Sequence, residues 1–480
     1  MKRILLTILL AVSPGSSRAV DARPNILFLF ADDQRADTIA ALGNPIIKTP
    51  NLDRLAHRGM SFMGAHMQGG MQGATCVPSR AMLLSGRNLF HIDEKLMRDA
   101  TWPEAFGKAG YTTFVSGKWH NGDASLARSF QIARSIFTGG MTNPMQAKLR
   151  DVTDGEVGAA KLAPKHACEV FADETIRFLK EHKGGPFFAY VPFDAPHDPH
   201  IVPEDFPVRY DVEKIPLPPS FLSQHPWDNG EMTVRDKQLL PWPRQPEAVR
   251  TMIAEYYRYI SYLDMQIGRV LDALEVSPFA NNTIVVFSAD SGVARGSHGL
   301  IGKQNVYEYD SVRVPLIIAG PGITANKRTG AMCYLFDVLP TLGKRCDVES
   351  PNQSDGFDFN ATLEDPKKPA RDHLMFAYRN VQRGFTDGHW KLILYPRVGK
   401  MQIFNLDADP HERNNLADWD RLDPVDLPFI KSKIGPLLER LKKERLASGD
   451  NAKLEPEHLM PAEWTPPKTS SEPVESKRTK

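Results

Sequence analysis

The sequence predicts an α/β fold built around a mostly parallel sheet, and two observations support this prediction. Short apolar runs rich in β-branched and aromatic residues alternate along the chain with segments of helical periodicity. These runs are nearly continuous in apolar character, which is typical of parallel strands that helices cover on both faces. The predicted strands are residues 26–30, 112–115, 187–191, 284–287 and 316–319.

Reactive side chains follow four of these five strands. In chain order they are Asp32 and Asp33, then Lys118 and His120, then His197, and finally Asp290 and Ser291. Ligands of such sheets bind beyond the carboxyl ends of the strands. We therefore expect these side chains to meet in one shared site, an expectation that rests on the strand ends alone.

The remaining segments complete the predicted organisation. Residues 203–246 are proline-rich and irregular, and we expect this long excursion to line a substrate cleft, with a helix at 247–274 after it. Turn-punctuated strands at 374–378, 384–386, 391–395 and 402–406 predict a small antiparallel sheet, which carries a final helix at 427–446. We therefore expect a catalytic domain at 23–365, a C-terminal subdomain at 366–450 and a tail at 451–480, whose polar, proline-rich composition predicts disorder.

The first 22 residues have the pattern of a signal peptide. Lys2 and Arg3 precede an apolar run at residues 4–12, and small residues then offer cleavage after Ala19 or Ala22. The apolar run is too short to span a bilayer, and no later segment has the pattern of a transmembrane helix. We expect an exported protein, periplasmic or secreted.

Composition excludes some classes of function. The formal net charge is +1 and no stripe of basic and aromatic residues is present, so nucleic acid is not an expected partner. A chain of 480 residues buries enough surface to fold without disulfides. Of the four cysteines, Cys333 and Cys346 remain available for a disulfide in an oxidising compartment, and Cys168 is isolated.

Three carboxylates at two strand ends predict a metal site. The adjacent Asp32 and Asp33 repel each other, and N-capping of a helix accounts for only one of them. Asp290 arrives from another strand end and adds a third carboxylate. Such a set of hard oxygen ligands suits Ca²⁺ or Mg²⁺.

The segment Cys76-Val77-Pro78-Ser79-Arg80 resembles the signature of the type I sulfatases, which belong to the alkaline phosphatase-like superfamily. A lone cysteine is ordinarily a small buried hydrophobe, but here the resemblance extends, motif by motif, over about residues 24–420. It implies an alkaline-phosphatase-like α/β fold and oxidation of Cys76 to formylglycine by a maturation enzyme. The hydrated aldehyde then has one hydroxyl to attack sulfur and a second with which to expel the bound sulfate.

The resemblance also implies how the metal and the nucleophile are held. The oxygen of formylglycine at Cys76 and the residue after Asp290 would join the aspartates as ligands. That residue is usually Asn or His in the family and is Ser291 here, a weaker ligand that water would supplement. Arg80 lies four residues after Cys76, on the same face of a helix predicted to begin at Pro78-Ser79, and would hold the diol.

Further motifs imply how sulfate is bound and protons are moved. Lys118 and Lys303 would bind sulfate oxygens, while His120 would take a proton from the remaining hydroxyl. His197 would contact sulfate and protonate the leaving oxygen. His200, in the same Ala195-Pro196-His197-Asp198-Pro199-His200 segment, either lines the substrate pocket or is a solvent-exposed turn histidine.

These observations together predict an exported, formylglycine-dependent sulfatase that acts on a sulfated carbohydrate. One alternative is a phosphonate or phosphate ester hydrolase of the same superfamily, which a second cation site would favour. Another is a catalytically silent protein that binds sulfate esters. That alternative requires the loss of a charged residue, whereas Ser291 is the departure from the family pattern.

Overall fold

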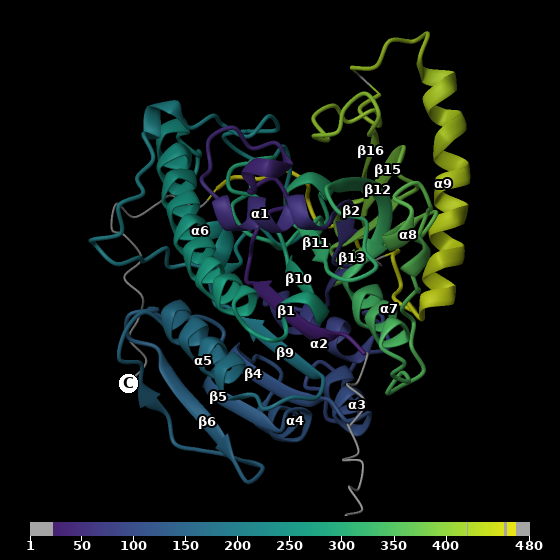
Figure 1. Cartoon of the computed structure of the whole chain (residues 1–480). Helices are drawn as coiled ribbons and strands as arrows, with labels where there is room; N and C mark the ends of the chain where they lie inside the picture. The colour runs from purple at the N-terminus through teal and green to yellow at the C-terminus, as the bar shows by residue number, and fades with distance from the viewer. Residues whose placement is uncertain (1–22, 420, 456–457, 467–480) are drawn as a thin grey trace, which may run out of the picture.

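The computed structural model describes residues 23–419, 421–455 and 458–466 (Figure 1). The predicted signal peptide at residues 1–22 lies outside the described residues. Within the described ranges, no helix has the length and apolar character needed to cross a bilayer.

A large mixed sheet forms the centre of the molecule. Its four central strands are parallel neighbours in the order β10 (Thr283–Ala289), β1 (Asn25–Ala31), β9 (Phe187–Pro192) and β4 (Thr112–Lys118). Beyond β10 follow β11 (Leu316–Ala319), β2 (Met60–His66) and β12 (Lys327–Tyr334), and beyond β4 follow β5 (Ile132–Phe137), β6 (Lys148–Thr153) and β7 (Glu156–Val157), with β8 (Lys161–Leu162) on β6. The five predicted strands are confirmed, although β11 runs antiparallel to β10.

Helices cover both faces of this sheet, as the apolar strands predict. Along β1, Phe28 and Phe30 pack with α2 (Cys76–Ser85), α3 (Trp102–Lys108) and α7 (Val338–Arg345). Leu27 and Leu29 point to the opposite face and pack with α1 (Pro50–Arg58), α5 (Ala167–Glu181) and α6 (Pro246–Glu275). Full burial of each such side chain stabilises the fold by about 1.5–3 kcal/mol, so this three-layer arrangement holds the strand ends rigidly. Two short helices, α4 (Asp123–Ser129) and α8 (Asn360–Glu364), complete this part.

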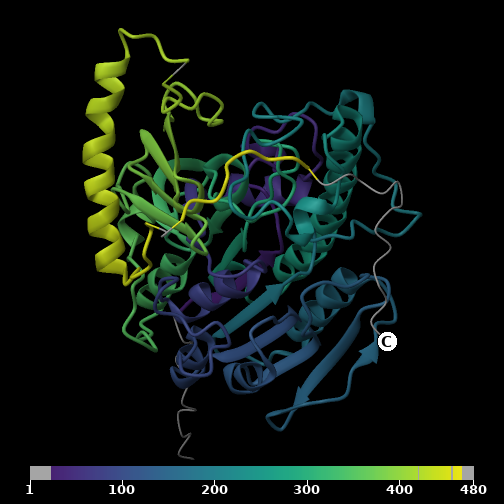
Figure 2. The ribbon, with the colours of Figure 1, turned by 180° about the vertical axis from the view of Figure 1, so that it is seen from behind.

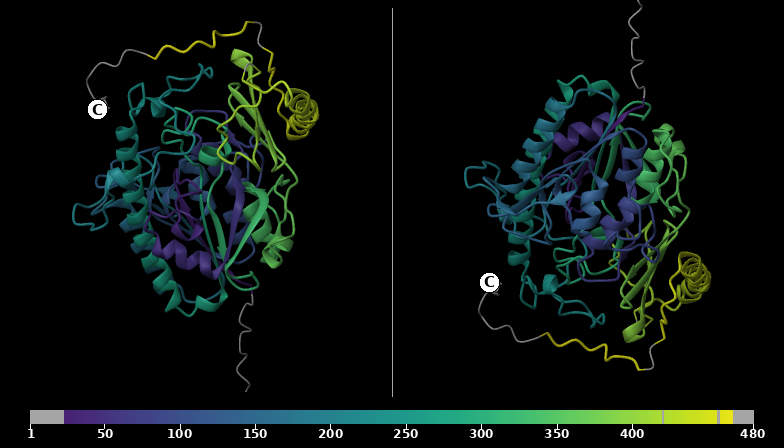
Figure 3. Two further views of the ribbon diagram at one scale, coloured as in Figure 1. Left: turned by 90° about the horizontal axis from the view of Figure 1, so that it is seen from above. Right: turned by 90° about the horizontal axis from the view of Figure 1, so that it is seen from below.

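A second, smaller sheet carries the long helix near the end of the chain. It has the order β16 (Lys400–Asn405), β15 (Trp390–Tyr395), β14 (Gln382–Thr386), β13 (Leu374–Tyr378) and β3 (Gly69–Gly70). Helix α9 (Leu427–Ser448) packs Ile430, Leu437 and Leu441 against one face of this sheet (Figure 3). The predicted antiparallel strands and final helix are confirmed, whereas the parallel edge strand β3 was not predicted.

The end of the described chain crosses the proline-rich segment (Figure 2). The Met460 amide donates to the carbonyl of Arg397 at 2.8 Å, and the ring of Trp464 packs edge-on against Trp242 with centroids 5.8 Å apart. For residues 458–466 this differs from the disorder that composition predicts, because single aromatic and aliphatic side chains anchor an otherwise polar stretch. Residues 467–480 of the predicted tail lie outside the described residues.

The four cysteines are free thiols, all of them buried. Cys333 lies on β12, whereas Cys346 follows α7, and no bond joins them. Packing of the hydrophobic core, and not a disulfide between these cysteines, therefore stabilises the fold.

Candidate active site

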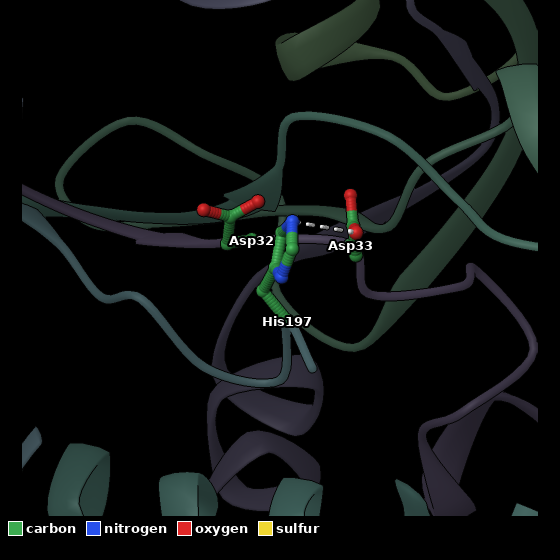
Figure 4. Close-up of side chains that lie close together, drawn as sticks. All are labelled: Asp32, Asp33 and His197. Carbon is green, nitrogen blue, oxygen red and sulfur yellow. Dashed lines mark ion pairs between the residues drawn. The ribbon is translucent and has the colours of Figure 1, made fainter. Parts of the chain in front are cut away.

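The predicted site residues converge at the carboxyl edge of the four central strands. Asp32, Asp33 and Asp290 follow β1 and β10, while Lys118 ends β4 and His197 lies beyond β9. Apart from His197, which is about 10% exposed, these side chains are buried. Figure 4 shows His197 between the two adjacent aspartates. These side chains therefore lie together at one site, as the strand ends predict.

A tight backbone turn lets both adjacent aspartates face this site. Successive residues of an extended strand point to opposite faces, but Asp33 has a left-handed φ of 65° just after β1 ends. Aspartate tolerates this conformation better than most residues. The Asp33 amide donates to Oδ1 of Asp290 at 3.0 Å, and the Ser291 hydroxyl donates to Oδ1 of Asp33 at 2.8 Å. These contacts hold Asp33 and Asp290 together, with Ser291 beside them.

Each carboxylate has a cationic partner. Lys118 Nζ contacts Oδ2 of Asp32, and Lys303 Nζ lies 2.7 Å from Oδ1 of Asp33. Nε of Arg80 donates to Oδ2 of Asp290 at 3.1 Å. Lys118 also donates to the carbonyl of Gly140, a contact that sequence reasoning did not find. Three buried cations thus surround three buried carboxylates.

Burial and neighbouring charges act differently on two of the carboxyl groups. Burial raises the pKa of Asp32, but Lys118 and then Arg80 outweigh it, so the pKa falls well below its usual range. For Asp290, burial and the charge of Asp32 raise the pKa above its usual range. The site holds both carboxylates ionised only while enough positive charge stays close.

Cys76 lies at the start of helix α2, with its Sγ 3.2 Å from Nδ1 of His120. The helix begins at Cys76, two residues before the predicted start at Pro78. Pro78 fits within the first turn because the amides there have no intrahelical partner. Burial raises the pKa of the Cys76 thiol, so an unmodified thiol is not poised as a thiolate nucleophile. Burial, followed by the charge of Lys118, lowers the pKa of His120 to about 3.

The two histidines of the segment at 195–200 have different surroundings. Nδ1 of His197 donates to the carbonyl of Asp198 at 2.8 Å, which directs Nε2 toward Oδ2 of Asp33 at 3.7 Å. His200 is half-buried, and its Nε2 lies 2.8 Å from the guanidinium of Arg295. The interpretation of His200 as an exposed turn residue is therefore wrong. The side chain of His200 also lies outside the lining of the cavity that opens onto Cys76.

A cavity of about 240 Å³ opens onto Cys76. His120, His197 and Lys303 line it, as do Gly73, Ala74, Gly140, Met141, Val234, Arg235, Asp236 and Gln304. Part of the proline-rich segment therefore lines the cleft, as the sequence predicts. The amide of Gln304 donates to Oδ2 of Asp236 at 2.6 Å, while Arg235 pairs with Asp198. These three lining residues were missed, since no periodicity or motif marks them.

The residues present fit a divalent cation. Oδ1 of Asp32 is buried and has no hydrogen-bond partner among the described residues. Ligand atoms of Asp32, Cys76 and Asp290 lie within 4.8 Å of one another, and so do those of Asp32, Asp33 and His197. A cation among these groups would satisfy the unpartnered oxygen and offset the repulsion between the carboxylates.

Comparisons with known proteins agree with this geometry. A family model described as Sulfatase matches residues 24–348, and one described as N-sulphoglucosamine sulphohydrolase, C-terminal, matches residues 296–435. A sulfatase from Formosa agariphila is 31% identical over 434 residues, which cover 82% of this chain and 83% of that protein. An N-acetylglucosamine-6-O-sulfatase from Bacteroides thetaiotaomicron is 27% identical, with 86% of each chain covered.

Two solved structures share the fold. One is in complex with its substrate D-glucosamine-2-N,6-O-disulfate, has a TM-score of 0.74 and 22% identity, and matches over 91% of this chain and 100% of that chain. The other is a phosphonate monoester hydrolase of Agrobacterium radiobacter, with a TM-score of 0.69, 22% identity and coverage of 88% and 96%. The fold is thus that of the alkaline phosphatase-like hydrolases. The chain belongs to the sulfatase family of this superfamily and is an enzyme that hydrolyses sulfate esters.

Proposed function

We propose that this sulfatase is exported and releases inorganic sulfate from a sulfated carbohydrate through a formylglycine formed at Cys76. The observation that carries the proposal is the position of Cys76. Its side chain faces a cavity at the start of a helix, next to His120 and the cluster of carboxylates and lysines. A buried thiol with a raised pKa is a poor nucleophile, so conversion to an aldehyde gives this position a chemical role.

Three features support a carbohydrate as the substrate. The named relative acts on N-acetylglucosamine 6-O-sulfate groups, and the solved neighbour holds a disulfated glucosamine. Arg235, Asp236 and Gln304 add charged and amide groups to the cavity wall, and such groups form hydrogen bonds with sugar hydroxyls. The predicted signal peptide supports export to a compartment that contains extracellular polysaccharides.

The residues of this chain divide the reaction between them. When bound, Ca²⁺ or Mg²⁺ held by Asp32, Asp33, Asp290 and residue 76, with Ser291 beside them, would polarise the nucleophile and a sulfate oxygen.

Lys118 and Lys303 bind the other sulfate oxygens and offset negative charge as it develops in the transition state. Arg80, held by Asp290 at 3.0 Å, fixes the helix turn that carries residue 76. His197 protonates the leaving oxygen, and His120 takes a proton from residue 76 so that sulfate is released.

The rival function is hydrolysis of phosphonate or phosphate esters. Both groups of described residues that could hold a metal ion include Asp32, which supports a single cation site. The phosphonate monoester hydrolase that shares the fold keeps this alternative open to experiment.

The proposal is tested with protein produced together with a formylglycine-generating enzyme. We expect the mass of the tryptic peptide containing residue 76 to show formylglycine at that position, and glucosamine 6-sulfate to be cleaved far faster than the monoester 4-nitrophenyl phenylphosphonate. Cys76→Ala should abolish turnover and leave the fold intact. Cys76→Ser should transfer sulfate once at most, because a serine lacks the second hydroxyl. Full activity with an unmodified thiol would refute the mechanism, and a preference for 4-nitrophenyl phenylphosphonate would favour the rival function.

A further inference from the structure

A second cavity, of about 410 Å³, lies apart from the cavity at Cys76. It lies between residues 35–46, the segment 216–219 and helix α6, and the two cavities share no lining residue. Its size falls within the range of small-molecule sites. The reaction proposed above makes no use of it.

Two guanidinium groups in its wall have no carboxylate within ion-pair distance among the described residues. Arg295 is about 2% exposed and stacks over the ring of Tyr256 at 4.8 Å, and its hydrogen-bond partner among the described residues is the ring of His200. Arg313 stacks over Tyr309 at 4.7 Å. Within the described part of the chain, the Nε atoms of Arg295 and Arg313 are buried without a hydrogen-bond partner, and neither side chain has an ion pair. A buried guanidinium is ordinarily paired, and Arg295 is buried without an ion pair, whereas Arg313 is half-buried. Both are available to an oxyanion.

The third arginine of this wall provides a contrast within the same cavity. Arg35 binds Asp37 through two hydrogen bonds, of 2.8 and 2.7 Å, and lies 3.1 Å from Oδ1 of Asp310. The carboxylate of Asp37, which lines the cavity, is thereby neutralised. Among the described residues, neither Arg295 nor Arg313 has a carboxylate within ion-pair distance, although the charge of Arg313 helps to lower the pKa of Asp37.

The rest of the wall is suited to the flat face of a ring. Tyr256, Tyr257 and Tyr309 contribute aromatic surface, and the segment 216–219 contributes proline rings. Such surfaces pack against the C–H face of a sugar, while guanidinium forks bind carboxylate or sulfate through paired hydrogen bonds.

We propose that this cavity is a second binding site, for a saccharide unit that carries a sulfate or carboxylate group. The unit contacts Arg295 and Arg313 through its oxyanion and the tyrosine rings through its face. The site touches the reaction centre through Tyr256, whose hydroxyl donates to the carbonyl of Asp33 at 2.6 Å and accepts from the Arg35 amide at 2.9 Å.

Binding is measured by calorimetry on full-length Cys76→Ala protein, which cannot turn over, so the outcome does not depend on the proposed mechanism. The probes are glucuronate and glucose 6-sulfate, with glucose as the neutral control. We expect glucuronate to bind and glucose not to bind. Arg313→Met should weaken glucuronate binding by about tenfold or more, as loss of a charged hydrogen bond predicts. Arg98→Met, at an arginine about 83% exposed and paired with Asp93, should change nothing.

Glucose 6-sulfate should occupy two sites, and Arg313→Met should remove one of them. Arg313→Lys keeps the charge but loses the fork, so its affinity for glucuronate should lie between those of the parent and Arg313→Met. Unchanged glucuronate affinity in a folded Arg313→Met protein would overturn the proposal. If that variant does not fold, crystals of Cys76→Ala soaked in glucose 6-sulfate decide: density between Arg295 and Arg313 supports the site, and its absence overturns it.

Discussion

Two regions of this molecule bury charged side chains, and they do so in different ways. At the reaction site, Asp32, Lys118 and Asp290 converge from separate strand ends next to a cavity, and one carboxylate oxygen of Asp32 has no hydrogen-bond partner in the described part of the chain. Behind the small sheet, Arg383 on β14 binds Asp450 just after α9 through two hydrogen bonds, of 2.7 and 3.0 Å.

The difference lies in how completely the charges are satisfied. Arg445 adds a 2.6 Å contact to Asp450, and Arg383 also donates to the carbonyls of Arg379 and Gln382. We call Arg383, Arg445 and Asp450 the clamp. Its charges are paired with one another. The reaction site, by contrast, can still bind a cation and an anion. Burial of charged side chains, which both regions share, is therefore not by itself a sign of function. We expect changes at the site to act on turnover and changes at the clamp to act on stability.

Removal of the divalent cation should have the largest effect. Dialysis against a chelator should stop sulfate release, because the carboxylates of Asp32, Asp33 and Asp290 would then lack their shared counter-ion. The melting temperature should fall in the same titration, since a ligand bound only to the folded state adds about 3 kcal/mol at a hundred times its Kd. Adding Ca²⁺ back is the control, and full activity in metal-free protein would exclude the metal site.

The atypical residue Ser291 sharpens this test. Ser291→Asn restores the side chain usual in the family and should retain or tighten Ca²⁺ binding, measured by calorimetry. In this structure the Ser291 hydroxyl donates to Asp33 at 2.8 Å. A loss of affinity would therefore assign the serine to holding Asp33 and not to the cation.

The two site histidines should separate the halves of the reaction. His120→Ala should allow the first sulfate transfer and then stall, leaving a sulfate adduct on the peptide of residue 76. His197→Ala should slow the first step, most of all for sugar sulfates, whose leaving groups are poor compared with those of aryl sulfates. Each loss should be about 10²–10⁴-fold, measured by rates and intact mass. Equal losses on both substrates without an adduct would assign the proton transfers to Lys118 and Lys303.

At the clamp, Asp450→Asn should reduce stability and leave turnover unchanged. Arg383 is fully buried, so the variant leaves its charge without a carboxylate and should cost about 3–5 kcal/mol in urea unfolding. The double variant Asp450→Asn with Arg383→Met should recover part of this loss. Asp418→Asn removes a partner of the exposed Arg421 and should cost less than about 1 kcal/mol. A large fall in turnover for Asp450→Asn would erase the contrast between the regions.

The smallest effect should come from a change at Glu412. This buried carboxyl group is only partly hydrogen-bonded, so it is intermediate between the reaction site and the clamp. Its Oε2 accepts from the amides of Glu308 and Tyr309 at 2.7 and 3.2 Å, while Oε1 has no hydrogen-bond partner among the described residues. Burial raises the pKa of Glu412 to about 7, whereas an unfolded glutamate titrates near 4.5.

The stability that its protonated form contributes is thus complete below pH 4.5 and is lost as the pH rises through about 7. Glu412→Gln should make the free energy of unfolding flatter between pH 5 and 8, by about 1–3 kcal/mol. Urea denaturation at several pH values measures this. Parallel curves for the two proteins would mean that Glu412 is not the titrating group, and a change in the pH profile of turnover would link it to the site.

Local patterns were sufficient for much of the fold. The apolar runs predicted the strands of the large sheet that lead into Asp32, Lys118, His197 and Asp290, because burial on both faces leaves a continuous apolar signature. The turn-punctuated runs after residue 365 predicted the small sheet, since alternation and turn residues are local signals. The motif at Cys76 identified the family in advance.

Contacts between distant parts of the chain were decided only by the tertiary structure. Lys118 pairs with Asp32 across 86 residues, and Lys303 pairs with Asp33 across 270. The periodicity of the sequence does not predict such pairings, because they depend on which strands become neighbours in the sheet. The same reason explains the missed edge strand β3, the packed residues 458–466 and the contact of His200 with Arg295. The sequence by itself determined which chemical groups reach the carboxyl edge of the sheet. The packing of three layers decided which of them touch, because only that packing brings distant segments within hydrogen-bond distance.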